Sequence, residues 1–175
     1  MTPRVVLVGL PGAGKTTTGR RLARILGVRF ADSDELVEAA TGRSVAEHFA
    51  ETGETAFRAV ETAAVTAALR DFDGVLALGG GALTTAATRA ALGACAAPVV
   101  LLRARVPTLA ARVGDAAGRP LLAGEPEQRL RQLAADRVAT YDEVATLTVD
   151  TDARTPGQVA SQIAALLHRM GASHG

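Results

Sequence analysis

The stretch GLPGAGKTT at residues 9–17 constrains the fold of this chain more than any other part of its sequence. It directly follows the apolar run VVLV and leads into a segment of helical periodicity at residues 16–26. The spacing Gly9-x-x-x-x-Gly14-Lys15-Thr16 between a strand and a helix is typical of a phosphate-binding P-loop. In such a loop, backbone N–H groups and the positive end of the helix face phosphate oxygens. An ordinary glycine-rich turn is the alternative, but the strand and helix on either side favour the P-loop.

Lys15 is the only lysine among 19 basic residues, and it lies inside this glycine-rich stretch. A lysine ammonium is a compact charge that can lie along phosphate groups, whereas the planar guanidinium of arginine suits bidentate clamping from outside the loop. The next residue, Thr16, carries the hydroxyl that P-loop proteins use to bind Mg²⁺. We therefore expect Lys15 to contact nucleotide phosphates and Thr16 to bind Mg²⁺.

Short apolar runs alternate with helical segments along the rest of the chain. Five runs predict strands, at residues 4–9, 28–32, 74–79, 98–103 and 145–150. Helices are predicted at residues 16–26, 54–69, 107–113, 125–142 and 156–170, and the capping-box pattern Ser44-x-x-Glu47 begins another. This alternation predicts an α/β fold, a parallel sheet covered by helices on both faces, with ligands at the carboxyl ends of the strands.

Composition limits the partners that such a domain can have. The 175 residues suffice for one domain with a full core, and 19 basic against 18 acidic residues leave a net charge of +1. This balance, together with 3% aromatic residues, argues against a nucleic-acid partner. Cys95 is the single cysteine and the three histidines lack ligand spacing, so neither an intramolecular disulfide nor a structural zinc site is expected. No apolar stretch approaches membrane-spanning length, which favours a cytoplasmic protein with a small polar ligand.

Among P-loop proteins, the sequence favours a small-molecule kinase. A GTPase would carry a guanine-reading Asn-Lys-x-Asp segment, which a chain with Lys15 as its only lysine cannot contain. A mechanical ATPase usually has an acid at the end of an apolar strand, but the third predicted strand ends in GVLALGGG. A small-molecule kinase remains, and its carboxylates must come from elsewhere.

The second predicted strand supplies two carboxylates in the sequence FADSD. Asp32 and Asp34 match the two-residue period of a strand, which would place both on one side of its carboxyl end. They would lie beside the P-loop if the first two strands are adjacent. The alternative interpretation is that Asp32 or Ser33 caps a following helix.

Arg58 and two phenylalanines are open to both structural and functional interpretations. Arg58 lies within helical reach of Glu54 and Glu61, and an exposed ion pair on a helix is the commoner situation. Phe49 and Phe57 are compatible with a simple core. Spacing alone does not choose between these interpretations.

Six motifs occur in the order GLPGAGKTT, DSD, ETGETAFRAVE, LGGGA, GRPLLAG and DRVATYDEVA. Through them the chain resembles the shikimate kinase family over nearly its whole length, and the actinobacterial members most closely. The resemblance implies the nucleoside-monophosphate-kinase type of α/β fold, with a five-stranded parallel sheet and helices on both faces. It also implies one P-loop kinase domain at residues 1–175, with a substrate-binding helical segment at 33–61 and a lid at 113–124.

The reaction implied by the resemblance is transfer of the γ-phosphoryl group of ATP to the 3-hydroxyl of shikimate, a step of aromatic amino-acid biosynthesis, with Mg²⁺ as cofactor. The catalytic residues would be Asp34 as the base, Lys15, and the lid residue Arg119. The expected enzyme is a cytoplasmic monomer that binds ATP and shikimate but neither nucleic acid nor membranes. A gluconate kinase is the alternative enzyme, and a nucleotide-gated binding module without chemistry is the alternative from another class.

The other site residues implied by the resemblance fall into three groups. The nucleotide group is Gly12, Ala13, Gly14, Lys15, Thr16, Thr17, Arg112, Arg119 and Arg154. The shikimate group is Asp34, Phe49, Phe57, Arg58, Glu61, Gly79, Gly80, Gly81 and Arg137. The metal group is Thr16 and, through water, Asp32. Within the shikimate group, Arg58 and Arg137 would hold the carboxylate, Glu61 would orient Arg58, and the three glycines would lie against the ring.

Overall fold

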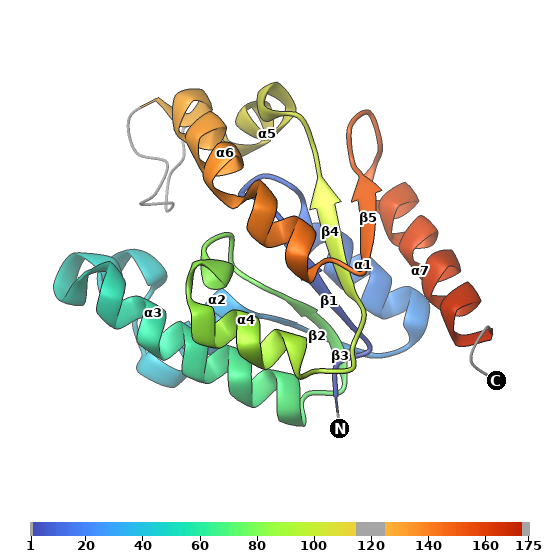
Figure 1. Ribbon diagram of the computed structural model, residues 1–175, viewed down its shortest axis with the longest axis horizontal. Helices are drawn as coiled ribbons and strands as arrows, with labels where there is room; N and C mark the ends of the chain where they lie inside the picture. The colour runs from blue at the N-terminus through green and yellow to red at the C-terminus, as the bar shows by residue number, and fades with distance from the viewer. Residues whose placement is uncertain (1, 115–124, 173–175) are drawn as a thin grey trace.

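Five short apolar runs form one parallel sheet in the computed structural model, which describes residues 2–114 and 125–172 (Figure 1). In chain order the strands are β1 (Val5–Val8), β2 (Arg29–Asp32), β3 (Gly74–Ala77), β4 (Val99–Arg103) and β5 (Leu147–Asp150). Their order across the sheet is β2-β3-β1-β4-β5, so β1 and its P-loop lie at the centre. All neighbouring pairs are parallel, which places the five carboxyl ends at one edge.

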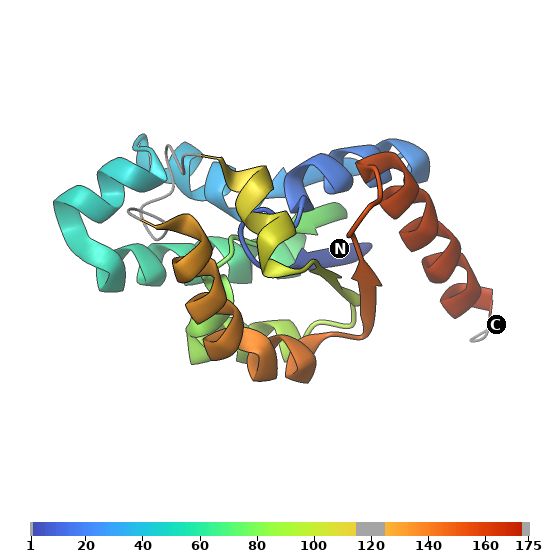
Figure 2. The same cartoon turned by 90° about the horizontal axis from the view of Figure 1, so that it is seen from above.

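Helices connect the strands and cover both faces of the sheet (Figure 2). In chain order they are α1 (Lys15–Leu26), α2 (Ser33–Thr41), α3 (Val45–Asp71), the 3₁₀ turn η1 (Ala82–Thr84), α4 (Ala86–Gly93), α5 (Val106–Val113), α6 (Pro126–Val144) and α7 (Pro156–Ala172). Helices α1 and α7 pack side by side on one face, and α3 and α4 pack together on the other. Within the described part of the chain, none of these helices has both the length and the apolar character needed to span a bilayer.

Alternate residues of the central strand contribute to two separate cores. Val5 and Leu7 pack with α1 and α7, whereas Val6 and Val8 pack with α3 and α4. All four side chains are almost completely buried, as is usual for a parallel sheet that is covered on both faces. The strand is therefore a continuous apolar run and does not alternate with polar residues.

The predicted architecture is confirmed, and each predicted strand agrees with the structure within two residues at either end. The capping box is also present, because the Ser44 hydroxyl accepts from Glu47 N and the Glu47 carboxylate accepts from Ser44 N. Helix α3 contains an interruption at Gly53, where φ is 79° and ψ is 173°. The helix predicted at 54–69 is therefore the second half of α3.

The interpretation of Asp32 and Asp34 as successive strand positions is wrong. Strand β2 ends at Asp32, whose Oδ1 accepts a hydrogen bond from Asp34 N and so caps α2. Because the chain turns into a helix at Ser33, Asp34 lies in the first helical turn. The first two strands are also not adjacent, since β3 lies between β1 and β2.

Candidate active site

The P-loop lies at the carboxyl end of β1 and leads into α1. Gly9 and Gly12 have φ values of 148° and 84°, which residues with a side chain rarely adopt. A Cβ at Gly9 would lie 2.5 Å from Leu102 O, and a Cβ at Gly12 would lie 2.8 Å from Leu109 O. Both positions require glycine because the loop turns tightly against β4 and α5.

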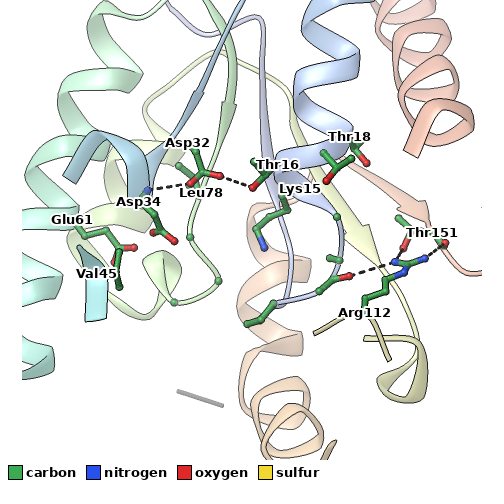
Figure 3. A pocket seen from close by; sticks show the side chains of 18 of the residues that line it. Lys15, Thr16, Thr18, Asp32, Asp34, Val45, Glu61, Leu78, Arg112 and Thr151 are labelled. Carbon is green, nitrogen blue, oxygen red and sulfur yellow. Dashed lines mark hydrogen bonds between the residues drawn. The ribbon is translucent and has the colours of Figure 1, made fainter. Parts of the chain in front are cut away.

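Lys15 begins α1, and its side chain folds back across the loop (Figure 3). Its Nζ donates hydrogen bonds to Gly9 O at 2.8 Å and to Leu10 O at 3.1 Å. The ammonium therefore lies within the P-loop, where it lines a cavity. A compact cation fits this position between backbone carbonyls, in agreement with the interpretation of the single lysine.

The Thr16 hydroxyl and the Asp32 carboxylate are in direct contact (Figure 3). Thr16 Oγ1 donates to Asp32 Oδ2 at 2.7 Å. Both groups offer the oxygen ligands that Mg²⁺ prefers. Over residues 2–114 and 125–172, no group of three or more His, Cys, Asp or Glu could hold a metal ion. The pair thus fits a Mg²⁺ that takes most of its ligands from water and phosphate.

Asp34 is a partly buried carboxyl group with charges of both signs around it. Burial is the main reason that its pKa rises from 3.8 to about 6. The negative charges of Asp32 and Glu61 raise this pKa further, whereas the positive charges of Lys15 and Arg58 oppose the rise. A carboxylate with a raised pKa is suited to accept a proton from a hydroxyl group.

Arg58 lies between two carboxylates and two aromatic rings. Its guanidinium donates to Glu61 Oε2 at 2.6 Å and to Glu54 Oε1 at 3.3 Å. Its Cζ lies 5.6 Å from the ring centroid of Phe49 and 5.3 Å from that of Phe57. Only 11% of the Arg58 side chain is exposed, so this is not a surface ion pair. Its two helical neighbours hold the guanidinium at the wall of the cavity.

Glu61 is the buried partner in this group. It is 1% exposed, and burial raises its pKa although the Arg58 cation lowers it. Its Oε1 has no hydrogen-bond partner among the described residues. The other oxygen, Oε2, holds Arg58 in place.

A glycine loop, defined as residues 79–81, follows β3 and lines the same cavity. The N–H of its first residue donates to Ser33 Oγ at 2.7 Å. The carbonyl oxygen of its second residue accepts one hydrogen bond from Arg137 Nη1 and another from Tyr141 OH at 3.1 Å. Arg137 is buried and does not line the cavity itself, but it contacts the loop that does.

Ser33 and Tyr141 are residues of the site that the sequence did not predict. The signal for Tyr141 is its position four residues after Arg137, which is one helical turn. The signal for Ser33 is its position between the two acids of the DSD motif. Burial raises the pKa of the Tyr141 phenol to about 12, so this group remains a hydrogen-bond donor.

Arg112 lies on the other side of the P-loop from Asp34 (Figure 3). Its guanidinium donates to Thr151 Oγ1 at 2.9 Å and to Thr151 O at 2.7 Å. Arg154 also lines the cavity and donates to Gln162 Oε1. Arg119, predicted in the lid, lies outside the described residues.

One cavity of about 580 Å³ joins these groups. Of the predicted site residues, those that line it are Gly12, Ala13, Gly14, Lys15, Thr16, Thr17, Asp32, Asp34, Phe49, Phe57, Arg58, Glu61, Gly79, Gly80, Gly81, Arg112 and Arg154. The structure thus brings a P-loop, three predicted acids and a nearly buried arginine to one opening. Such a site can hold a nucleotide and an anionic acceptor next to each other.

Comparisons of the sequence and of the structure with known proteins all match members of one family. The family model for shikimate kinase matches residues 11–168. A curated shikimate kinase of Salinispora tropica is 51% identical over 167 residues, which cover 95% of this chain and 99% of that protein. One of Mycobacterium tuberculosis is 49% identical over 164 residues, covering 93% and 92%. The solved shikimate kinase from Acinetobacter baumannii in complex with shikimate has a TM-score of 0.89 and 39% identity, covering 97% of this chain and 94% of that chain.

Proposed function

This chain belongs to the shikimate kinase family, and we propose which of its residues carry out each part of the reaction. The reaction is ATP-dependent phosphorylation of the 3-hydroxyl of shikimate, which yields shikimate 3-phosphate for aromatic amino-acid biosynthesis. The residue roles below rest on the geometry of the cavity and on the motifs that match the family.

The main support for these roles is that the P-loop and the buried arginine open into one cavity. Asp34 interacts electrostatically with both Lys15 and Arg58. A hydroxyl bound beside Asp34 therefore lies near both the phosphate side and the carboxylate side of the site. Phosphoryl transfer depends mainly on such positioning and on charge neutralisation.

The nucleotide side of the site is the P-loop and the two arginines beyond it. The N–H groups of residues 12–17 bind the phosphates, and Lys15 lies along them. Arg112 and Arg154 lie at the adenine end of the cavity. In the free protein, the bonds from Arg112 to Thr151 hold its guanidinium in that region.

Mg²⁺ is the proposed cofactor, held by Thr16 directly and by Asp32 through water. The contact between their oxygens supports this choice. When bound, Mg²⁺ neutralises negative charge on the phosphates. Asp32 also keeps the first turn of α2 in place, because its Oδ1 caps that helix.

The acceptor side of the site is built around the shikimate carboxylate and ring. Arg58 and Arg137 hold the carboxylate, because a guanidinium fork binds carboxylates in a bidentate manner. Glu61 orients Arg58, as its hydrogen bond indicates. Phe49 and Phe57, whose ring centroids are 4.6 Å apart, form one wall of the pocket. The glycine loop lies against the ring.

In the proposed chemical step, Asp34 is the base that accepts the proton of the 3-hydroxyl. Its raised pKa favours proton acceptance, and the nearby cations keep the carboxylate ionised at neutral pH. Lys15 and Arg119 neutralise charge on the transferring group. Arg119 belongs to the proposed lid at residues 113–124, of which 115–124 lie outside the described residues.

The proposed organisation is one kinase domain over residues 1–175 with a substrate-binding segment at 33–61. That segment covers α2 and α3 as far as Glu61, so it includes the interruption of α3 at Gly53. The protein is proposed to act as a cytoplasmic monomer, without nucleic-acid or membrane partners. The net charge of +1 is in keeping with the proposed lack of nucleic-acid and membrane partners.

The experiment that tests the function is a coupled assay of ADP release with shikimate, gluconate and nucleoside monophosphates under identical conditions. Shikimate should stimulate ADP release far more than the other acceptors, and phosphorus NMR should show a single phosphate ester at the 3-hydroxyl. A preference for gluconate would favour the alternative kinase. ATP binding without turnover on any acceptor would favour the binding module.

A further inference from the structure

The glycine loop separates the side chains proposed to act on the acceptor. A Cβ at Gly79 would lie 2.5 Å from Asp34 Oδ1 and 2.9 Å from Glu61 Oε1. A Cβ at Gly81 would overlap the guanidinium of Arg58. These approaches leave no room for a side chain. The backbone of the loop therefore sets the spacing between the proposed base and the proposed carboxylate-binding arginine.

The same loop also touches the nucleotide side of the site. A Cβ at Gly80 would lie 2.9 Å from Pro11 Cδ, in the P-loop. The loop therefore packs against both sides of the site, and its closest approaches, at Gly79 and Gly81, are to the acceptor side. Because glycine has no side chain to lock the loop by packing, its position depends on hydrogen bonds to its backbone.

Besides Arg137 and the donors of the adjoining turn η1, which are Ala82 N to Gly79 O and the N–H and hydroxyl of Thr84 to Gly81 O, two side chains from distant parts of the sequence make such hydrogen bonds. Ser33, in the first turn of α2, accepts from Gly79 N at 2.7 Å and is completely buried. Tyr141, on α6, donates to Gly80 O at 3.1 Å and is 6% exposed. The loop is therefore held by α2 at its first residue and by α6 at its second.

Arg137 shares the Gly80 carbonyl with Tyr141. Arg137 is also one of the two arginines assigned to the shikimate carboxylate, so its guanidinium must serve both the loop and the substrate. The phenol keeps a hydrogen bond on the carbonyl oxygen whichever way the guanidinium turns. The loop therefore does not depend on Arg137 alone for the hydrogen bond to Gly80 O.

We propose that Ser33 and Tyr141 are positioning residues that fix the glycine loop at the acceptor side of the site, which sets the affinity for shikimate. This inference rests on the proposed placement of shikimate against the loop. Neither residue touches the substrate, and both act through backbone groups of the loop. Their effect belongs to the acceptor side because the closest approaches of the loop are to Asp34 and Arg58.

Single-oxygen deletions test the proposal. Ser33→Ala and Tyr141→Phe each remove one hydroxyl, and Thr88→Val is the matched control. Thr88 is fully buried, and its Oγ1 lies 2.9 Å from Thr62 Oγ1 between α4 and α3. For each variant, kcat, the KM for shikimate, the KM for ATP and the Tm would be measured, with calorimetric titration of shikimate as an equilibrium check.

Each of the two loop variants should raise the KM and the Kd for shikimate by about three- to tenfold, the range expected for one lost hydrogen bond, and change the KM for ATP less than about twofold. Thr88→Val should lower the Tm without changing either KM. Equal changes in both KM values, or a lower Tm with unchanged KM values, would show that Ser33 and Tyr141 only stabilise the fold.

Arg58→Lys, measured in parallel, separates this inference from the proposed site. If Arg58→Lys leaves shikimate affinity unchanged, the placement of the substrate is wrong. If it weakens shikimate binding while Ser33→Ala and Tyr141→Phe do not, the substrate site stands and the positioning role is overturned.

Discussion

The Thr16 hydroxyl donates a hydrogen bond of 2.7 Å to Asp32 Oδ2, which ties the first turn of α1 to the carboxyl end of β2. The two elements meet although β3 lies between β1 and β2 in the sheet. The other carboxylate oxygen, Oδ1, caps α2 at Asp34 N. Asp32 therefore links the proposed metal site to the proposed base, and its capping role and its metal role are compatible.

We expect Asp32→Asn to raise the Mg²⁺ concentration needed for half-maximal activity while leaving the Tm nearly unchanged. Asparagine caps helices about as well as aspartate does, so the bond from Asp34 N can persist. A neutral amide is a poorer partner for hydrated Mg²⁺. Activity would be titrated with Mg²⁺ at saturating substrates, with thermal unfolding as the control. A large drop in Tm and an unaltered Mg²⁺ requirement would show that capping is the main role of Asp32.

Asp34→Asn should lower kcat by roughly 10²–10⁴-fold, the range for losing a positioned acid–base group, with little change in ATP affinity. In the wild type, kcat/KM for shikimate should rise with pH through about 6 and then level off, because the base must be ionised and burial raises the pKa of Asp34 to about 6. The pH profile of the variant should lack this step. A profile that keeps the step would assign it to another group.

The free energy of unfolding should fall as the pH rises through about 6, whereas the activity should rise over the same range. The pKa of Asp34 is 3.8 when unperturbed and about 6 in the folded protein, so between these values the folded state holds a proton that the unfolded chain has released. The stabilisation is complete below pH 3.8 and is lost as the pH rises through about 6, a change of about 3 kcal/mol in the free energy of unfolding at most.

The neutral variant Asp34→Asn should therefore be more stable than the wild type at pH 8 and should lose that advantage at pH 4. Urea unfolding at the two pH values, without nucleotide or Mg²⁺, measures the difference. An advantage of equal size at both pH values would mean that ionisation of Asp34 is not its cause.

The strands and the P-loop could be predicted from the sequence because their signals are local. The run VVLV is buried on both faces and carries no polar residue, and the P-loop motif GLPGAGKT follows it directly. The order of the strands has no local signal, since it depends on pairing between distant segments. The condition that the first two strands are adjacent is therefore not met, although Thr16 and Asp32 still meet through their side chains.

The role of individual site residues was predictable only in part. Arg58 was ambiguous because its pairing with Glu54 and Glu61 is local, whereas its burial is a result of tertiary packing. Ser33 and Tyr141 offer only the signal of their positions beside predicted site residues, because the roles of a serine and a tyrosine become clear only when their backbone partners are known. Both partners lie in the glycine loop, far away in the sequence.

Lys15→Arg should reduce kcat by about 10²-fold or more although the charge is kept. The ammonium lies 2.8 Å from Gly9 O and 3.1 Å from Leu10 O, a position that a planar guanidinium cannot share without displacing the loop. Turnover and ATP affinity would be measured, with the Tm as a check on folding. Near-normal turnover would refute the explanation offered for the single lysine.

Arg58→Lys should weaken shikimate binding by about 1.5–3 kcal/mol, the scale of a hydrogen bond to a charged group, and leave ATP affinity nearly unchanged. Lysine keeps the charge but loses the fork that reaches Glu61, Glu54 and the substrate carboxylate together.

Arg131→Lys is the matched control, because Arg131 pairs with Glu127 at 2.9 Å on the surface of α6, where its side chain is 70% exposed. Such a pair contributes little, so the control should change neither binding nor the Tm. Calorimetric titration with shikimate and with ATP distinguishes the two cases. An unchanged shikimate affinity combined with a lowered Tm would show that Arg58 serves only the packing of α3.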